Sequence, residues 1–338
     1  MSVPLSILDL APVGTGFGAE ESLRRSTELV RRAETLGYKR FWVAEHHNMP
    51  GIASTAPEVL IAHLSAVTSS IRVGSGGVML PNHAPLAVAE RFGMLEALHP
   101  GRIDLALGRA PGTDQVTAMA LHSRGAGMFP EEVQEIGAML RGEMGRLSAV
   151  SSPSASPDIW VLGSSGDGAA IAASIGAGYA HAHHIGPRNT VGALELYRER
   201  FTPSALGEDP RTIVASIAVA ADTEEEAERH AKPLAVSMAR LRAGRPGKLP
   251  SAEEAEGVQI DPRYEPVANA RIDNAAVGTA EQVHERLENL RERSGAQELM
   301  LITMLHSQDA RLRSYELIAE QYRLAGAVSS GQVQTGSS

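Results

Sequence analysis

The chain has 338 residues, 43% of them hydrophobic, which indicates one large folded domain rather than a disordered polypeptide. Its 40 acidic and 31 basic side chains give a net charge of -9 with no basic block, so the charge pattern excludes a nucleic-acid-binding surface. The absence of cysteine excludes disulfides, thiolate metal sites and a cysteine nucleophile.

The chain begins with MSVPLSILDLAPVG, which has neither the basic region nor the long apolar region of a signal peptide. No apolar run approaches the ~20 residues that a membrane span requires. The sequence therefore predicts a cytoplasmic protein without a membrane partner.

Short apolar runs alternate with amphipathic segments along most of the chain. The segment 20–36 places Leu23, Val30 and Ala33 on one helical face and ends at Gly37, a residue suited to a left-handed helix cap. A last helix is expected over 308–325. The predicted strands cover residues 5–10, 40–44, 71–80, 102–108, 158–163, 178–184, 213–220 and 298–303. Eight strand and helix alternations predict a (β/α)8 TIM barrel rather than an open doubly wound sheet.

One segment interrupts this alternation. Residues 241–276 are rich in proline, glycine and charge, and a loop of that length in a compact domain is usually a lid or a mobile insertion. We therefore expect a single barrel domain over 1–328 with a lid-like insertion over 241–276, before the last strand. The serine-rich residues 329–338 are expected to form a disordered tail.

An acid and two histidines, Glu45, His46 and His47, follow the second predicted strand. Barrel enzymes build their sites at the carboxyl ends of the strands, where a histidine can move protons near neutral pH. The glutamate could orient a neighbouring histidine or tune its charge. The alternative is structural: one histidine caps the loop and the other packs against it.

Three more histidines, His181, His183 and His184, end the sixth predicted strand. Strand alternation points His181 and His183 to the same side. Together with His46 and His47 they could bind zinc or iron on a hydrolase barrel. Such sites usually include a carboxylate at a strand end, and the early strand ends offer only Asp9, so we expect no metal.

Glycines weaken the third predicted strand, which contains Gly74, Gly76 and Gly77. They are explained either by a flat ligand ring that lies against bare backbone or by a simple β-bulge. The two interpretations remain open.

A serine- and glycine-rich turn follows the fifth predicted strand. Gly163, Ser164 and Ser165 precede a helix, whose N-terminal N–H groups could bind a phosphate; an ordinary serine cap is the alternative. Arg109, after the fourth strand, could pair with phosphate or carboxylate, or form a surface ion pair.

Four stretches, LDLAPV, ERFGMLEALHPGRIDLALGRAPGTD, VLGSSG and VGTAEQVHERL, occur in that order. In them the chain resembles the bacterial luciferase-like flavin-dependent monooxygenase superfamily, particularly its single-chain members. The resemblance covers nearly the whole length, and its most specific part runs from Phe41 to Asp114.

The resemblance implies a TIM barrel that binds reduced FMN. It also implies that the reduced FMN reacts with O2 to give a flavin C4a-hydroperoxide, which oxygenates a small organic substrate. It places the catalytic histidine at His46 and a non-proline cis peptide, against the flavin ring, at Gly76 and Gly77. It places the phosphate contacts at Arg109 and at the turn of Gly163, Ser164 and Ser165. Because no nicotinamide fingerprint is present, a separate flavin reductase would supply the reduced FMN. Related barrels also predict a homodimer.

The same superfamily includes deazaflavin- or FMN-dependent dehydrogenases and reductases, which form the first alternative. A metal-dependent TIM-barrel hydrolase and a non-catalytic flavin-binding protein are alternatives of other classes. Gly163 and Gly108 stand where luciferase has a glutamate and a cysteine, so light emission is not implied.

Overall fold

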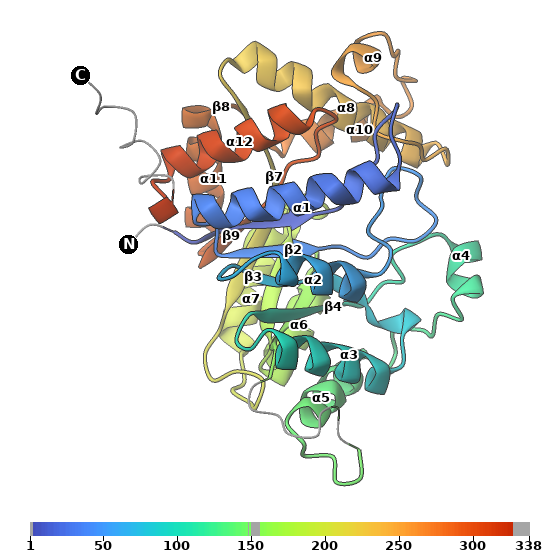
Figure 1. The fold of residues 1–338 in the computed structure, drawn as a ribbon, viewed down its shortest axis with the longest axis vertical. Coiled ribbons are helices and arrows are strands. Elements are labelled where there is room, and N and C mark those ends of the chain that lie inside the picture. Colours follow the sequence, from blue (N-terminus) through green and yellow to red (C-terminus); the bar gives the residue numbers. More distant parts are fainter. Residues whose placement is uncertain (1–2, 148, 150–155, 327–338) are drawn as a thin grey trace.

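Parallel strands form the centre of the structure (Figure 1). The structure is a computed structural model that describes residues 3–147, 149 and 156–326. The predicted tail, 329–338, lies outside the described residues. The strands are β1 (Leu5–Asp9), β2 (Arg40–Val43), β3 (Arg72–Met79), β4 (Ile103–Gly108), β5 (Asp158–Gly163), β6 (Gly178–Ala182), β7 (Thr212–Ala221), β8 (Ala276–Thr279) and β9 (Glu298–Ile302).

Eight of these strands close into a barrel. They pair in the order β6, β5, β4, β3, β2, β1, β9, β7, and a further pairing of β6 with β7 closes the ring. The predicted TIM barrel and its eight strands are confirmed. The ninth strand, β8, was not predicted: it pairs in parallel with residues 218–221 of β7, beyond the part of β7 that pairs with β6.

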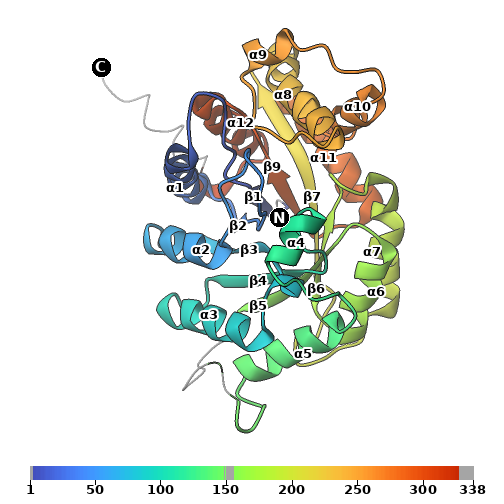
Figure 2. The ribbon, with the colours of Figure 1, turned by 90° about the vertical axis from the view of Figure 1, so that its right-hand side faces the viewer.

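Helices surround the barrel (Figure 2). They are α1 (Ala19–Leu36), α2 (Pro57–Ala66), α3 (Pro85–Leu98), α4 (Gln115–Ala120), α5 (Phe129–Leu140), α6 (Gly166–Ile175), α7 (Thr190–Arg200), α8 (Glu224–Arg242), α9 (Ala252–Glu256), α10 (Glu265–Asp273), α11 (Ala280–Ser294) and α12 (Gln308–Gln321), with short 3-10 helices η1 (Leu80–Asn82) and η2 (Pro187–Asn189). Within the described part of the chain, none of the helices is both long and apolar enough to cross a membrane.

Helix α1 follows the sequence pattern closely. Val30 and Ala33 are buried, and Leu23 packs against the same core. Gly37 ends the helix with φ of 86°, the left-handed conformation that a side chain disfavours. The buried stripe therefore fixes which face of α1 meets the barrel.

Alternate strand residues divide the core into two main clusters. Leu8 and Trp42 belong to the cluster inside the barrel, whereas Ile7 and Phe41 pack between the strands and the helices. This period-two pattern follows from strand geometry, which points successive side chains to opposite faces. The strands are apolar on both faces because both faces are covered.

A buried ion network occupies the amino-terminal end of the barrel. Arg40, the first residue of β2, donates to Asp104 Oδ2 at 2.7 Å and to Glu298 Oε1 at 2.7 Å. Arg72 donates to the other oxygen of Asp104 at 2.6 Å, and Ser6 donates to Glu298 at 2.6 Å. The network joins five strands at the end of the barrel opposite to the strand carboxyl ends.

The insertion over 241–276 has structure of its own. It contains the end of α8 and helices α9 and α10, and Leu249 makes two backbone hydrogen bonds of 2.9 Å with the loop after β1, to Val13 O and from Thr15 N. That loop in turn bonds the loop after β2, through Val13 N to Gly51 O at 2.9 Å. Backbone hydrogen bonds thus link three segments distant in sequence beside the carboxyl ends of β1 and β2, as isolated bridges that pair Gly14 with Leu249 and Pro12 with Ile52. Its predicted function as a lid remains a prediction.

Candidate active site

The carboxylate of Glu45 lies at the centre of the loops that follow β2 and β3. Glu45 comes two residues after the last residue of β2 and is fully buried. Its oxygens accept hydrogen bonds from His47 Nε2 (2.8 Å), Met79 N (2.9 Å), Asn82 Nδ2 (3.2 Å) and His83 Nε2 (2.9 and 3.0 Å). Burial raises the pKa of Glu45, but the hydrogen bonds from His83 and His47 outweigh it, so this pKa lies below its ordinary value. Glu45 is therefore an ionised carboxylate at neutral pH.

His46 lies between Glu45 and His47 in the sequence, but its side chain does not bind the Glu45 carboxylate. Its backbone N–H donates to Ser54 O at 3.1 Å, which fixes the main chain. Its Nδ1 atom is buried and, among the described residues, has no hydrogen-bond partner. Burial lowers the pKa of His46, and the opposing effect of Glu45 does not cancel it. The imidazole is thus neutral at pH 7 and retains an unused polar atom, as a proton carrier would.

Two polar residues of the site, Asn82 and His83, were missed in the sequence. Asn82 ends η1, the turn after β3, and His83 follows it; both bind the Glu45 carboxylate, and Asn82 Nδ2 also donates to Pro111 O at 2.9 Å. The only signal in the sequence was a polar pair after a glycine-rich strand. Their partner, Glu45, is more than 35 residues away, so no local spacing could have identified them.

The peptide bond between Gly76 and Gly77 is cis, as the resemblance implied. The register of β3 against β4 also shifts between Gly76 and Val78, so the bulge proposed as an alternative is present as well. A Cβ atom on Gly77 would lie 2.5 Å from Ala106 O and 2.6 Å from Leu162 Cδ1. Close packing therefore requires glycine here, and the predicted contact with a flat ring remains a prediction.

The turn from β5 into α6 lies next to Arg109. Ser165 is the N-cap of α6, but its side chain accepts no hydrogen bond from the helix. The first N–H groups of α6 are therefore not capped by Ser165. A guanidinium nitrogen of Arg109 lies 3.6 Å from the Asp167 carboxylate in the first turn of α6. The structure therefore brings the predicted arginine and the predicted phosphate turn together, with an exposed acid beside them.

The glycine at the end of β5 has a packing reason. A Cβ atom on Gly163 would meet the Tyr179 hydroxyl at 3.0 Å and the backbone of Gly168 at 3.2 Å. Ser164 O accepts from Asn189 Nδ2 at 3.2 Å, which ties the turn to η2. Packing at Gly163 and the hydrogen bond from Asn189 thus hold the turn in place.

The three histidines of the sixth strand separate. Because β6 ends at Ala182, the alternation rule does not extend to His183, whose Nδ1 contacts Thr190 Oγ1 at 2.8 Å. Burial lowers the pKa of His181 to about 4, and that of His184 to about 3. Over residues 3–147, 149 and 156–326, no group of three or more His, Cys, Asp or Glu side chains is placed to hold a metal ion.

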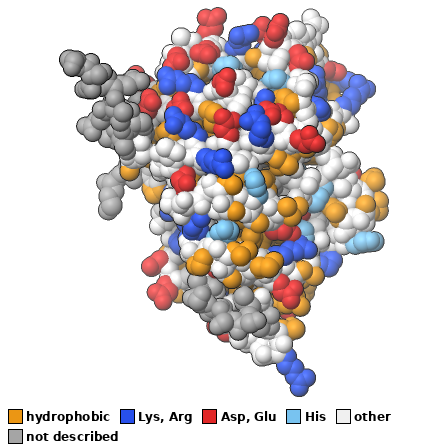
Figure 3. Space-filling view, viewed as in Figure 1, with side chains coloured by type: hydrophobic (Ala, Val, Ile, Leu, Met, Phe, Trp, Pro, Cys, Tyr) orange, Lys and Arg blue, Asp and Glu red, His pale blue; other side chains and the backbone are white. Residues whose placement is uncertain are grey.

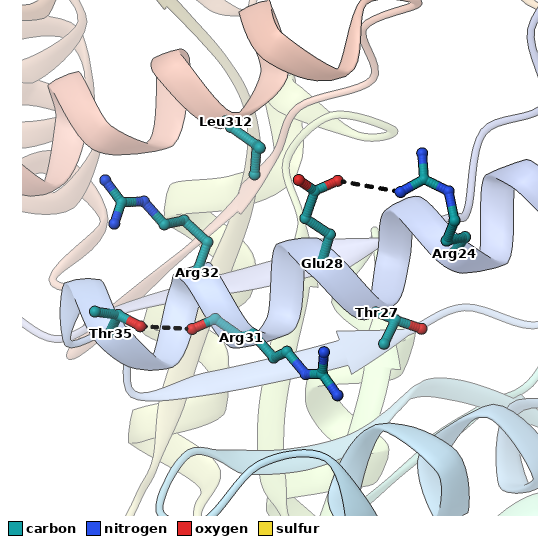
Figure 4. A pocket seen from close by; sticks show the side chains of 7 residues that line it. All are labelled: Arg24, Thr27, Glu28, Arg31, Arg32, Thr35 and Leu312. Atoms are coloured by element: carbon teal, nitrogen blue, oxygen red, sulfur yellow. Dashed lines mark hydrogen bonds and ion pairs between the residues drawn. The ribbon is translucent and has the colours of Figure 1, made fainter.

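Two cavities lie outside this cluster of loops. A groove of about 490 Å³ on the outer surface is lined by α1 and by Leu312 of α12 (Figure 4). A second, of about 630 Å³, lies between α7, α11 and the α10 to β8 connection, and includes His183. Neither is lined by His46, Arg109 or the glycines of β3, so neither cavity includes the predicted site residues.

Comparison with known proteins identifies the class that this fold and site define. A family model described as luciferase-like monooxygenase matches residues 3–298. Among the relatives, the uncharacterized protein YvbT of Bacillus subtilis is 42% identical over 94% of this chain and 96% of its own length. A luciferase-like monooxygenase of Escherichia coli is 40% identical over 94% and 96%. The N-acetyl-S-alkylcysteine monooxygenase of Bacillus subtilis is 33% identical over 94% and 98%.

Solved structures agree. The structure of apo-MsnO8 is similar with a TM-score of 0.86 and 36% identity, over 95% of this chain and 99% of that one. The oxygenating constituent of 3,6-diketocamphane monooxygenase from Pseudomonas putida, in complex with FMN, shares the fold alone, with a TM-score of 0.72 and 18% identity over 95% and 98%. The barrel fold is shared with these monooxygenase structures. This chain belongs to the luciferase-like monooxygenase family.

Proposed function

We propose that this protein is a monooxygenase that uses reduced FMN and O2 to oxygenate a small organic substrate. The observation that carries the proposal is the meeting of three features at one end of adjacent strands: His46 after β2, the glycines of β3, and Arg109 beside the start of α6. A reaction of bound FMN needs a group that moves protons, a flat surface for the ring and a site for the phosphate anion, and these three features would supply them.

The residues fit this cofactor. The positive end of α6 and the guanidinium of Arg109 suit the phosphate. The Cβ positions of Gly76 and Gly77 are filled by Leu8, Ala106 and Leu162, so a flat ring would lie against the main chain of these glycines and not in a space left by their missing side chains. When bound, reduced FMN would supply the electrons that activate O2. The protein's part is to orient that group, exclude water from it and manage protons.

The side chain that handles the proton is His46. A neutral imidazole with an unpartnered Nδ1 can accept a proton or hold a hydrogen bond to the reacting group, and a neighbouring ionised Glu45 stabilises the imidazolium that results. His47 is already hydrogen-bonded to Glu45, so it is a structural neighbour of the base.

The relatives support the substrate class and the cofactor. The N-acetyl-S-alkylcysteine monooxygenase acts, by its name, on a small thioether acid, and the diketocamphane enzyme was solved with FMN. The alternative is hydride transfer with a reduced deazaflavin. It is favoured by a similar fold, with a TM-score of 0.65, in an F420-dependent secondary alcohol dehydrogenase.

Oxygen consumption decides between them. We expect the purified protein, with FMN reduced by a separate flavin reductase, to consume O2 and to oxygenate a member of a panel that includes N-acetyl-S-methylcysteine. We also expect it to bind FMN at least tenfold more tightly than riboflavin, because a charge-assisted phosphate contact contributes about 1.5–3 kcal/mol. Turnover only with reduced F420 would establish the alternative. Flavin binding without turnover on the panel would indicate a flavin-binding protein.

We further propose a homodimer that forms through α2 and α3. Val59, Met94 and Leu98 are 68%, 60% and 63% exposed, and hydrophobic side chains gather over these helices (Figure 3). Exposed apolar patches of this kind mark protein interfaces. Sedimentation should give a particle of twice the 35.7 kDa chain mass. The Met94→Glu variant should shift it toward the single-chain mass, whereas Leu241→Glu, on α8, should not. A wild-type particle of 35.7 kDa at micromolar concentration would contradict the dimer.

A further inference from the structure

The fully buried carboxylate of Glu45 has all of its hydrogen-bonding capacity in use. Two carboxylate oxygens offer about four acceptor sites. Four donors occupy them, and we call the set the Glu45 clamp: Glu45 with His47 Nε2, Met79 N, Asn82 Nδ2 and His83 Nε2. The clamp therefore leaves no acceptor for His46, although His46 is the next residue in the chain.

The clamp also extends to the loop after β4. Thr113 Oγ1 donates to His47 O at 2.9 Å, and Arg124 Nη2 donates to His83 O at 2.5 Å. Asn82 reaches the same loop through Pro111 O. Three loops from neighbouring strands are thus joined through residues that bind a single carboxylate.

The two clamped histidines differ chemically from His46. His47 and His83 each commit Nε2 to Glu45, so that nitrogen cannot exchange a proton with a ligand without breaking a charge-assisted bond. The backbone N–H of His46 bonds Ser54, and its Nδ1 has no partner within the described part of the chain. The carboxylate thereby distinguishes one histidine from two neighbours of the same type.

We infer that Glu45 is the positioning residue of this active site: it holds the loops after β2, β3 and β4 around His46 and keeps His47 and His83 out of proton transfer. For its kinetic consequence the inference rests on the proposed function. Its structural consequence, the protection of two histidine rings, does not depend on any reaction.

The test compares Glu45→Gln with the matched control Glu34→Gln. Glu34, on α1, is also a multiple acceptor, but its partners lie at the opposite end of the barrel: it binds the backbone N–H groups of Ser69, Ser70 and Ile71, just before β3, at 2.8, 2.6 and 3.0 Å. In Glu45→Gln the amide nitrogen replaces an oxygen and meets a donor, so the clamp loses an acceptor and its charge.

The first measurement is histidine modification by diethyl pyrocarbonate in the protein without added flavin, mapped by mass spectrometry. Loss of a charge-assisted bond of about 1.5 kcal/mol should raise the modification rate of His47 and His83 about tenfold in Glu45→Gln. Glu34→Gln should leave both rates unchanged. Equal rates in wild type and Glu45→Gln, or an equal rise in Glu34→Gln, would overturn the inference.

The second measurement is steady-state turnover with reduced FMN. Glu45→Gln should lower kcat about 10- to 100-fold with KM for reduced FMN within about threefold, because the geometry around His46 is lost rather than the cofactor contacts. Glu34→Gln should keep kcat. A rise in KM alone, or an unchanged kcat, would contradict the positioning role. If the wild type shows no turnover, the proposed function fails while the modification experiment still decides the clamp.

Discussion

Replacing His46 with alanine is expected to lower turnover by about 10²–10⁴-fold, the usual contribution of a general acid or base. The affinity for FMN should stay within about threefold, or about 0.7 kcal/mol, because the predicted cofactor contacts come from other loops. Stopped-flow turnover and fluorescence titration with FMN measure the two quantities separately. The control is His284→Ala. The ring of His284 packs on that of Tyr322, with 4.6 Å between the ring centroids, on the outer helices, so this variant should retain turnover.

The pH dependence follows from the same residue. Burial lowers the pKa of His46, and the charge of Glu45 only partly opposes this, so the imidazole is neutral above that lowered value. Activity that needs a neutral base should be constant at neutral pH and fall as the pH drops through a pKa below 6.5. This acidic limb should be absent from the residual activity of His46→Ala. A limb that persists unchanged in the variant would assign it to another group.

Replacing Arg40 with methionine is expected to lower the free energy of unfolding by about 3–5 kcal/mol. The guanidinium is 3% exposed, and it is shared between Asp104 and Glu298, with the shortest contact to each at 2.7 Å. Methionine keeps much of the volume of arginine. It removes the positive charge and the hydrogen bonds that Arg40 gives to two buried carboxylates. Removing one partner of a buried ion pair costs more than never having had the pair.

Urea denaturation followed by circular dichroism measures this loss. Arg31→Met, at an exposed position on α1, should change the unfolding free energy by no more than about 0.5 kcal/mol. Arg40→Lys keeps the charge but loses the two-sided geometry, so its loss should be intermediate. A loss below about 1 kcal/mol for Arg40→Met would show that Arg72, Lys39 and Ser6 compensate the two carboxylates without Arg40.

The sequence was most informative where a pattern is periodic. Short continuous apolar runs predicted the eight barrel strands, because both faces of a covered parallel sheet are buried, and a helical stripe of apolar residues predicted α1. Strand β8 was missed because it is four residues long, contains Gly278 and pairs only with the extension of β7. The helices α9 and α10 inside the insertion were missed because its proline and glycine content indicated a loop.

The site was predictable only in part. His46 and Arg109 stand at strand ends, which a barrel topology makes suspect, and Arg109 does lie beside the first turn of α6. The role of Glu45 as a shared acceptor was not predictable, because its partner His83 comes from another strand's loop. Contacts between loops depend on the barrel closing, and no local spacing encodes them.

The hydrogen bonds that link the insertion to the loop after β1 affect how this protein could be redesigned. Leu249 makes two backbone bonds to that loop, Lys248 Nζ donates to Phe17 O at 2.6 Å, and Glu254 accepts from Thr15 Oγ1 at 2.5 Å. A chimera that exchanges the whole of 241–276 would remove these anchors from the loops that lead to His46. Grafting only the part after Glu254 would exchange α10 and leave the anchors in place, and that junction is where transplantation of specificity between related enzymes should begin.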